Sequence, residues 1–308
     1  MKPTSVIFLI VAVLLVVGGF TCMGIAEKMA AAEGIELVNK QTDEENHVFT
    51  YEYGDDSIGR ITLNIKDAEV NIIGGASDSY IELINFADGM YEFSSANNIL
   101  SISNNSNLSS LNGIASMAMN FKGLRSLVSY YNISGRDKIV NVYISDECPV
   151  KIVSCELDTG AVTIEDGSTQ TDYNIMLGEG DLTLRSIATT SVVGAEIGTG
   201  DILLDTCRIS NFNAEIEKGS VEAIASDFMR IQATLHEGDF DLGYMYEASY
   251  VNLELSTGMG KIYIDGEDKN GFYEVTGVPS STLFDITLGS GDITLHSNMK
   301  PTVDETAE

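Results

Sequence analysis

The sequence predicts an all-β protein built as a parallel β-solenoid, in which short strands wind into stacked coils of about 20 residues. One observation is a glycine that recurs at nearly constant spacing through the second half of the chain. It stands at Gly160, Gly180, Gly200, Gly219, Gly238, Gly260 and Gly291. The other is the alternation of apolar and polar residues on both sides of each glycine, which is the period of a β-strand. Together they predict seven similar units.

Each unit has apolar residues at fixed distances from its glycine. Ile202 and Leu204 follow Gly200 at the second and fourth positions. The sixth unit matches through Leu253 if Gly258-Met259 is an insertion. A glycine between two strand segments permits the positive-φ bend that turns the chain a corner. Since ordering each residue costs roughly 1–2 kcal/mol, one unit cannot fold alone, and neighbouring units must stack. An antiparallel sandwich is the alternative fold.

The balance of charges excludes one class of partner. The chain of 308 residues carries 46 Asp and Glu against 17 Lys and Arg, a formal net charge of −29. Nucleic-acid binding requires a basic surface, so we expect no nucleic-acid partner.

The four cysteines form neither a CxxC pair nor a Cys/His cluster, so no zinc site is predicted. Because the sequence contains no catalytic motif, we predict that the protein is not an enzyme.

Residues 1–26 are predicted to form a transmembrane anchor or a signal. The stretch 3–26 contains no charged residue and is long enough to span a bilayer. Lys2 precedes it and acidic residues follow, which places the N-terminus in the cytoplasm and the rest of the chain outside. The alternative is a signal peptide that is cleaved at Gly24-Ile25-Ala26. Residues 27–57 are polar and acidic, and are predicted to form a stalk.

Alternation typical of strands predicts a solenoid domain over residues 58–298, interrupted at 108–131 by apolar residues at helical spacing. The stretch 93–136 around this helical insertion contains no acidic residue. The insertion is interpreted either as a cap on the solenoid or as a helix that contacts the membrane surface or a partner. In the second case the contacting residues are Met117, Phe121, Lys122 and Arg125. Residues 299–308 are predicted to be a disordered tail.

An aspartate follows the repeat glycine in four units, as Asp181, Asp201, Asp239 and Asp292. Other units have Ser220 or Lys261 at this position. Stacked coils lie about 4.8 Å apart, so neighbouring carboxylates repel each other unless a donor or a cation lies between them. Hydrogen bonding to the backbone at the turn is one interpretation. Bound calcium, which prefers oxygen ligands, is the other. No further cofactor is expected.

The units at residues 197–204 and 288–295 read IGTGDILL and LGSGDITL. With the apolar N-terminal segment, they resemble the bacterial candidate-adhesin family of β-strand repeat proteins, domain of unknown function 4097. The resemblance covers residues 59–298, and the helical insertion departs from the family's pattern. It implies a right-handed β-solenoid on the bacterial cell surface, with no catalytic residues to carry over.

These observations predict a membrane-anchored, extracytoplasmic binding or adhesion module without catalytic activity. Its partner is expected to be a component of the cell envelope, namely a glycan, a protein or a lipid. Residues 3–26 would hold it in its own membrane as a single-pass protein, or it is secreted after signal cleavage. The alternative function is an envelope-stress accessory or sensor that acts through the acid-free segment 93–136. A spacer without a specific partner is a third hypothesis.

Overall fold

The computed structural model describes residues 48–53, 58–86, 91–105, 135–148, 150–165 and 171–299. Within these ranges the chain forms twenty β-strands and one short 3-10 helix, Ala248–Tyr250, which confirms the all-β prediction. The chain divides into two units, 1–45 and 46–308, and the first lies outside the described residues. The predicted anchor, most of the stalk, the helical insertion and nearly all of the tail also lie outside them.

Parallel pairing between equivalent residues builds the central stack. One sheet contains β7 (Ile152–Glu165), β8 (Asp172–Glu179), β10 (Ala188–Thr199) and β12 (Arg208–Lys218), paired in this order. The other contains β9 (Leu182–Arg185), β11 (Ile202–Asp205) and the start of β13 (Val221–Glu237). Long strands such as β7 and β13 turn a corner and belong to both sheets. The predicted parallel solenoid core is therefore confirmed, and its handedness stays a prediction.

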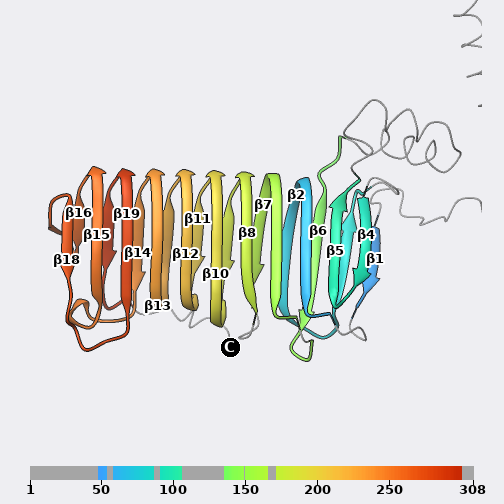
Figure 1. Ribbon diagram of the computed structural model, residues 1–308, viewed down its shortest axis with the longest axis horizontal. Helices are drawn as coiled ribbons and strands as arrows, with labels where there is room; N and C mark the ends of the chain where they lie inside the picture. Colours follow the sequence, from blue (N-terminus) through green and yellow to red (C-terminus); the bar gives the residue numbers. More distant parts are fainter. Residues whose placement is uncertain are drawn as a thin grey trace, which may run out of the picture. The chain divides into compact units, whose positions relative to one another are not determined.

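The coils at both ends of the stack do not follow the order of the chain. β2 (Arg60–Ala76) lies between β7 on one side and β5 (Ile99–Asn104) and β6 (Ile139–Ser145) on the other. At the far end, the coil of β19 (Leu283–Ser290) and β20 (Ile293–His296) is inserted between two others. Its neighbours are the coil of β13 and β14 (Phe240–Tyr244) and the coil of β15 (Asn252–Met259) and β16 (Ile262–Ile264). Figure 1 shows β19 between β13 and β15.

The pairing also corrects the alignment of the sixth unit. Leu255 lies opposite Ile286, and Met259 lies opposite Ser290, in continuous register. Gly258-Met259 is therefore not an insertion, and Leu255 rather than Leu253 takes the equivalent buried position. The alternation in β15 repeats every second residue, so a shift of two residues leaves the apolar pattern unchanged and cannot be detected from it.

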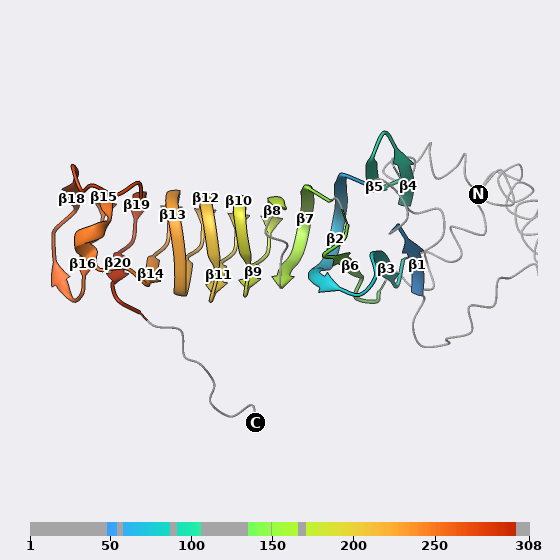
Figure 2. The same ribbon diagram turned by 90° about the horizontal axis from the view of Figure 1, so that it is seen from below.

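Antiparallel strands cover the edges that the outermost coils would otherwise leave open. At one end β4 (Tyr91–Ala96) pairs with β5, β3 (Tyr80–Ile84) with β6, and β1 (Val48–Glu52) with β3. At the other end β18 (Phe272–Val275) pairs with β15, and β17 (Glu267–Asp268) with β16. Figure 2 shows the two layers, with β1 and β4 at one end and β18 at the other. Because β1 belongs to the fold, residues 48–52 are not part of the predicted stalk at 27–57.

The core lies between the two sheets and is formed by the predicted columns of apolar residues. In the coil of β10 and β11, the side chains of Val193, Ala195, Ile197, Ile202 and Leu204 are buried. The residues between them, such as Glu196 and Leu203, face outward and are exposed or half-buried, so both outer sheet faces are open to solvent. Within the described ranges, no helix has the length and apolar character needed to cross a membrane.

Candidate functional site

A shallow groove of about 420 Å³ lies on the outer face of the sheet formed by β7, β8, β10 and β12. Its floor is backbone, because Gly178 and Gly198 stand at equivalent positions of neighbouring coils. A Cβ atom at Gly198 would lie 2.5 Å from the carbonyl oxygen of Gly178, so neither alanine nor a larger residue fits without a shift of the backbone. These two glycines leave a depression between the larger side chains on either side.

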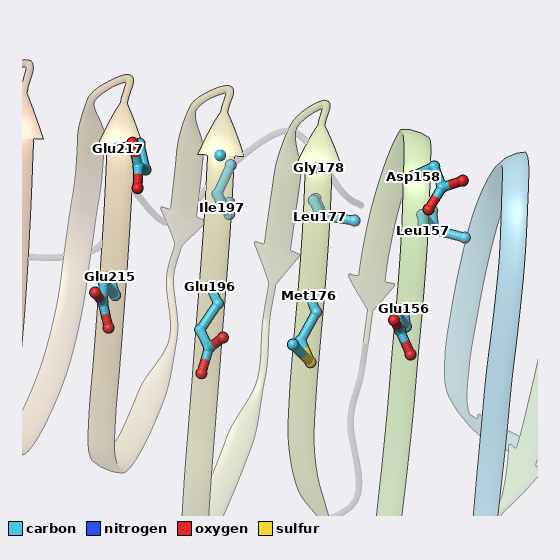
Figure 3. Close-up of a pocket in the computed structure, with 11 residues that line it drawn as sticks. Glu156, Leu157, Asp158, Met176, Leu177, Gly178, Glu196, Ile197, Glu215 and Glu217 are labelled. Atoms are coloured by element: carbon cyan, nitrogen blue, oxygen red, sulfur yellow. The ribbon is translucent and has the colours of Figure 1, made fainter.

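Five exposed carboxylates surround this depression, and we call the site the acidic groove. They are Glu156, Asp158, Glu196, Glu215 and Glu217. Figure 3 shows Glu156, Met176, Glu196 and Glu215 in one row across the four strands. Their order follows from the register, because each stands four residues before the repeat glycine of its unit. Parallel pairing therefore collects carboxylates that are far apart in the sequence.

Few positive charges or donors compensate these carboxylates. Glu156 accepts a hydrogen bond from the Asn64 amide at 2.7 Å. Within the described part of the chain, the other four carboxylates make no side-chain hydrogen bond or ion pair. Lys218, next to Glu217 in the chain, instead lies 3.7 Å from Glu237. Carboxylates that are directly opposite one another, such as Glu196 and Glu215, destabilise the sheet by repulsion.

A second hollow of about 380 Å³ continues the face beyond the acidic groove. It lies over Gly194 and is lined by the amide side chains of Asn174, Asn213 and Gln232. It shares Met176, Glu196 and Glu215 with the acidic groove. The Met176 side chain is 46% exposed, which adds an apolar contact to the face. The whole face thus offers hydrogen-bond acceptors, amides and one thioether on a rigid sheet.

The four aspartates predicted as calcium ligands stand at the first turn of their coils and bond the backbone of the next coil. Asp181 Oδ1 accepts a hydrogen bond from the Asp201 N–H at 2.9 Å. Asp201 Oδ1 accepts one from the Ser220 N–H at 2.7 Å. Ser220 Oγ then accepts one from the Asp239 N–H at 3.2 Å. These contacts agree with the interpretation that the aspartates accept hydrogen bonds from the backbone at the turn.

The same series of hydrogen bonds from backbone N–H groups to aspartate side chains, which we call the aspartate ladder, continues through the inserted coil. Asp239 Oδ1 accepts from the Asp292 N–H, and Asp292 Oδ1 accepts from the Lys261 N–H, both at 2.8 Å. Within the described ranges, no group of three or more His, Cys, Asp or Glu is arranged to hold a metal ion. Oδ1 of each of the four aspartates already accepts a hydrogen bond from a backbone N–H. Calcium binding by these aspartates stays a prediction.

The cysteines in the described residues do not offer a reactive thiol in the core. Cys148, Cys155 and Cys207 are free, and the last two are buried. Burial raises the pKa of the Cys155 thiol to about 12 and that of the Cys207 thiol to about 11. Both thiols are therefore protonated at neutral pH and pack as small apolar groups.

The acidic groove was not among the sites predicted from the sequence. Its signal was present in the outward positions, because Glu156, Glu196 and Glu215 each stand four residues before a repeat glycine. Alignment of those positions, and not only of the apolar ones, would have found the row. Met117, Phe121, Lys122 and Arg125, predicted to contact the membrane or a partner, lie outside the described residues. The alternative function through segment 93–136 therefore stays a prediction.

Comparison with protein-family models matches residues 58–303 to the model described as Toastrack DUF4097. No curated protein matches the chain. Among solved structures, the chain is similar to a candidate adhesin from Bacteroides fragilis, with 13% identity, a TM-score of 0.48, and coverage of 82% of this chain and 97% of that one.

Two further solved structures show similarity of the same kind. A candidate cell adhesion protein from Clostridium sporogenes has 13% identity and a TM-score of 0.35, with 82% of this chain and 99% of that chain covered. A candidate lipid-binding protein from Parabacteroides distasonis has 8% identity and a TM-score of 0.37, with coverage of 82% and 94%.

Proposed function

The chain belongs to the Toastrack DUF4097 family, and we propose that it is a membrane-anchored, extracytoplasmic binding or adhesion module without catalytic activity. In this proposal residues 3–26 hold the chain in the membrane, and the solenoid presents its outer sheet faces to the cell envelope. The solenoid supplies rigidity, because its columns of side chains are held in register by parallel pairing.

The acidic groove is the observation that supports this proposal. Four of its carboxylates make no side-chain hydrogen bond or ion pair within the described residues, although like charges in register destabilise a sheet. A partner that carries amino or guanidinium groups would relieve this repulsion and form charge-assisted hydrogen bonds. We therefore propose that the partner is an envelope component that presents positive charge at the groove.

The test is a binding assay of the full chain, reconstituted in nanodiscs, against wall glycan and solubilised membrane proteins. The double variant Glu196→Gln/Glu215→Gln removes two facing carboxylates from the groove. We expect its affinity to fall about tenfold, which corresponds to about 1.4 kcal/mol, and the retention of the unaltered chain to decrease with added salt.

The matched control is Glu222→Gln/Asp241→Asn. These two residues face each other on the outer side of the other sheet, so the control changes the net charge by the same amount. Equal losses in both double variants would mean that only the overall charge matters. No loss in the groove variant would remove the groove as the binding site. A parallel assay with a chelator tests the calcium prediction, which requires that chelation reduce retention.

A further inference from the structure

The end of the stack at which β1 enters carries a cluster of aromatic side chains. Its members are Phe49, Tyr51, Phe86, Tyr91 and Phe93, and we call them the aromatic end cluster. Ring centroids of Tyr51 and Phe93 lie 4.4 Å apart, those of Phe86 and Tyr91 4.3 Å, and those of Phe49 and Phe93 6.0 Å. Strands β1 and β4 thus contact each other through these rings across the end of the solenoid.

The position of the cluster follows from strand alternation. β1 is the outermost strand of one sheet and β4 the outermost strand of the other, as Figure 2 shows. Phe49 and Tyr51 alternate with Thr50 and Glu52, so their rings point to the space between the sheets, where another coil would otherwise stack. Within the described residues no further coil stacks on Phe49, whereas Tyr51 is half-buried. Phe49 remains 44% exposed, whereas Leu100 in the next coil is fully buried.

The size of this end argues against a second copy of the chain as its occupant. Two sheets lie about 10 Å apart and a five-residue strand spans roughly 17 Å, so the end offers on the order of 200 Å². Stable protein interfaces bury about 800 Å² on each partner. A lipid surface needs no such area, because aromatic rings partition into the membrane–water interface individually.

The connection to the proposed anchor favours a lipid surface. The first residue of β1 is Val48, so the chain enters the fold at this end. The uncharged stretch 3–26 lies upstream, and the residues between them reach at most about 75 Å when extended. A tethered surface faces the membrane at high effective concentration, so a few aromatic contacts are enough to hold it there.

We propose that the aromatic end cluster docks on the lipid–water interface of the membrane that holds residues 3–26. The solenoid would then project away from that membrane, with the acidic groove on its side. Glu52 and Glu92 are exposed beside the cluster, so contact with zwitterionic lipid is favoured over contact with anionic lipid. This inference rests on the proposed membrane anchoring.

The test uses the full chain in phosphatidylcholine vesicles, with and without lipids brominated near the head of the acyl chain. The sequence contains no tryptophan, so Phe49→Trp introduces a single fluorescent reporter into the cluster. We expect brominated lipid to reduce its emission about twofold or more, because the ring lies at the interface. Phe93→Trp is a second reporter in the cluster, should the first variant fail to fold.

The matched control is Phe272→Trp, at an exposed position in β18 at the opposite end of the stack. Its emission should be unchanged by brominated lipid. Equal quenching of both reporters would overturn the proposal, as would emission from the cluster that iodide quenches and brominated lipid does not. Blue-shifted emission without lipid quenching would also overturn the proposal, because it would show that protein covers the cluster. The covering protein would be a second copy if the blue shift depends on protein density, and another part of the same chain if it does not.

Extraction of the vesicles at alkaline pH separates failure of this inference from failure of the proposed anchoring. Release of the unaltered chain from the vesicles would contradict the anchor, and with it the premise of the docking. A chain that stays in the vesicles while its cluster remains unquenched would overturn the docking alone.

Discussion

At the scale of single residues, the first turn of the seven coils with a repeat glycine leaves room only for glycine at that position. Gly200 has a φ of 148°, and a Cβ atom there would lie 1.9 Å from the carbonyl oxygen of Gly180. Ala68 occupies the position opposite Gly160 in β2, and its φ is not positive. The backbone at residue 68 is therefore compatible with alanine, whereas the positive φ at residue 200 favours glycine.

Substitution of Gly200 by alanine should destabilise the fold strongly. We expect a loss of more than about 3 kcal/mol in the free energy of unfolding, because the clash is with backbone and the φ is unfavourable for an L-residue. Denaturant unfolding followed by circular dichroism measures this loss. Gly194→Ala is the control, since its Cβ would lie 3.3 Å from the Asn174 side chain and 3.9 Å from the Tyr173 carbonyl oxygen, and it should lose less than about 1 kcal/mol. Similar midpoints for the two variants would contradict the argument.

At the scale of strands and coils, three kinds of contact define the order of the stack: strand pairing, the packing of the repeat glycines and the aspartate ladder. β19 pairs with β13 on one side and β15 on the other. A Cβ atom at Gly260 would meet the oxygen of Gly291, and one at Gly291 would meet that of Gly238. The aspartate ladder passes from Asp292 to the N–H of Lys261, which lies in the coil of β15 and β16. Insertion of the coil of β19 and β20 gives it parallel partners on both sides, so it does not form an exposed edge.

Engineered disulfides can test this order directly. Thr234 and Thr287 are opposite each other in adjacent coils, so the pair Thr234→Cys/Thr287→Cys should form a disulfide on mild oxidation. The control pair is Thr234→Cys/Ser256→Cys, which are separated by the inserted coil and should stay reduced. Mass spectrometry of non-reduced peptides, in a Cys148→Ser background, identifies the bridges. A disulfide in the control pair would show instead that the coils stack in chain order.

At the scale of the whole molecule, the chain has a net charge of −29, and its described residues form few ion pairs that compensate it. The pairs in the described residues are mostly exposed, such as Arg185 with Glu165 and Lys261 with Asp268. Exposed pairs of this kind contribute about 0–1 kcal/mol each. Repulsion among the remaining carboxylates therefore opposes folding, and salt should weaken it.

The melting temperature should rise when sodium chloride is increased from about 10 mM to about 0.5 M, because the Debye length falls from about 30 Å to a few ångströms. Differential scanning calorimetry of the full chain at neutral pH measures the change. The control is the same series near pH 4, where many carboxylates are protonated and the salt effect should shrink. A melting temperature that is constant or falls with salt at neutral pH would contradict the role of repulsion.

The sequence alone determined the core of this protein. Alternation around each repeat glycine is a local property, and it suffices to place residues such as Val193 and Ile202 inside the solenoid, where they are buried. The aspartates after the glycines were likewise expected at the turn, with backbone bonding and calcium as the two interpretations. Backbone bonding is what the structure shows, because the next coil presents its N–H groups at hydrogen-bonding distance.

Only the tertiary structure decided which coils are neighbours, and therefore which surfaces exist. Units with the same pattern can pair with one another in any order, so the pattern cannot show that β19 lies between β13 and β15. The acidic groove depends on the same information, since its carboxylates meet only across adjacent coils. The aromatic end cluster likewise requires β1 and β4 to close one end, although some 40 residues separate them in the chain. Local periodicity defines what is buried, whereas long-range strand pairing defines what the surface can bind.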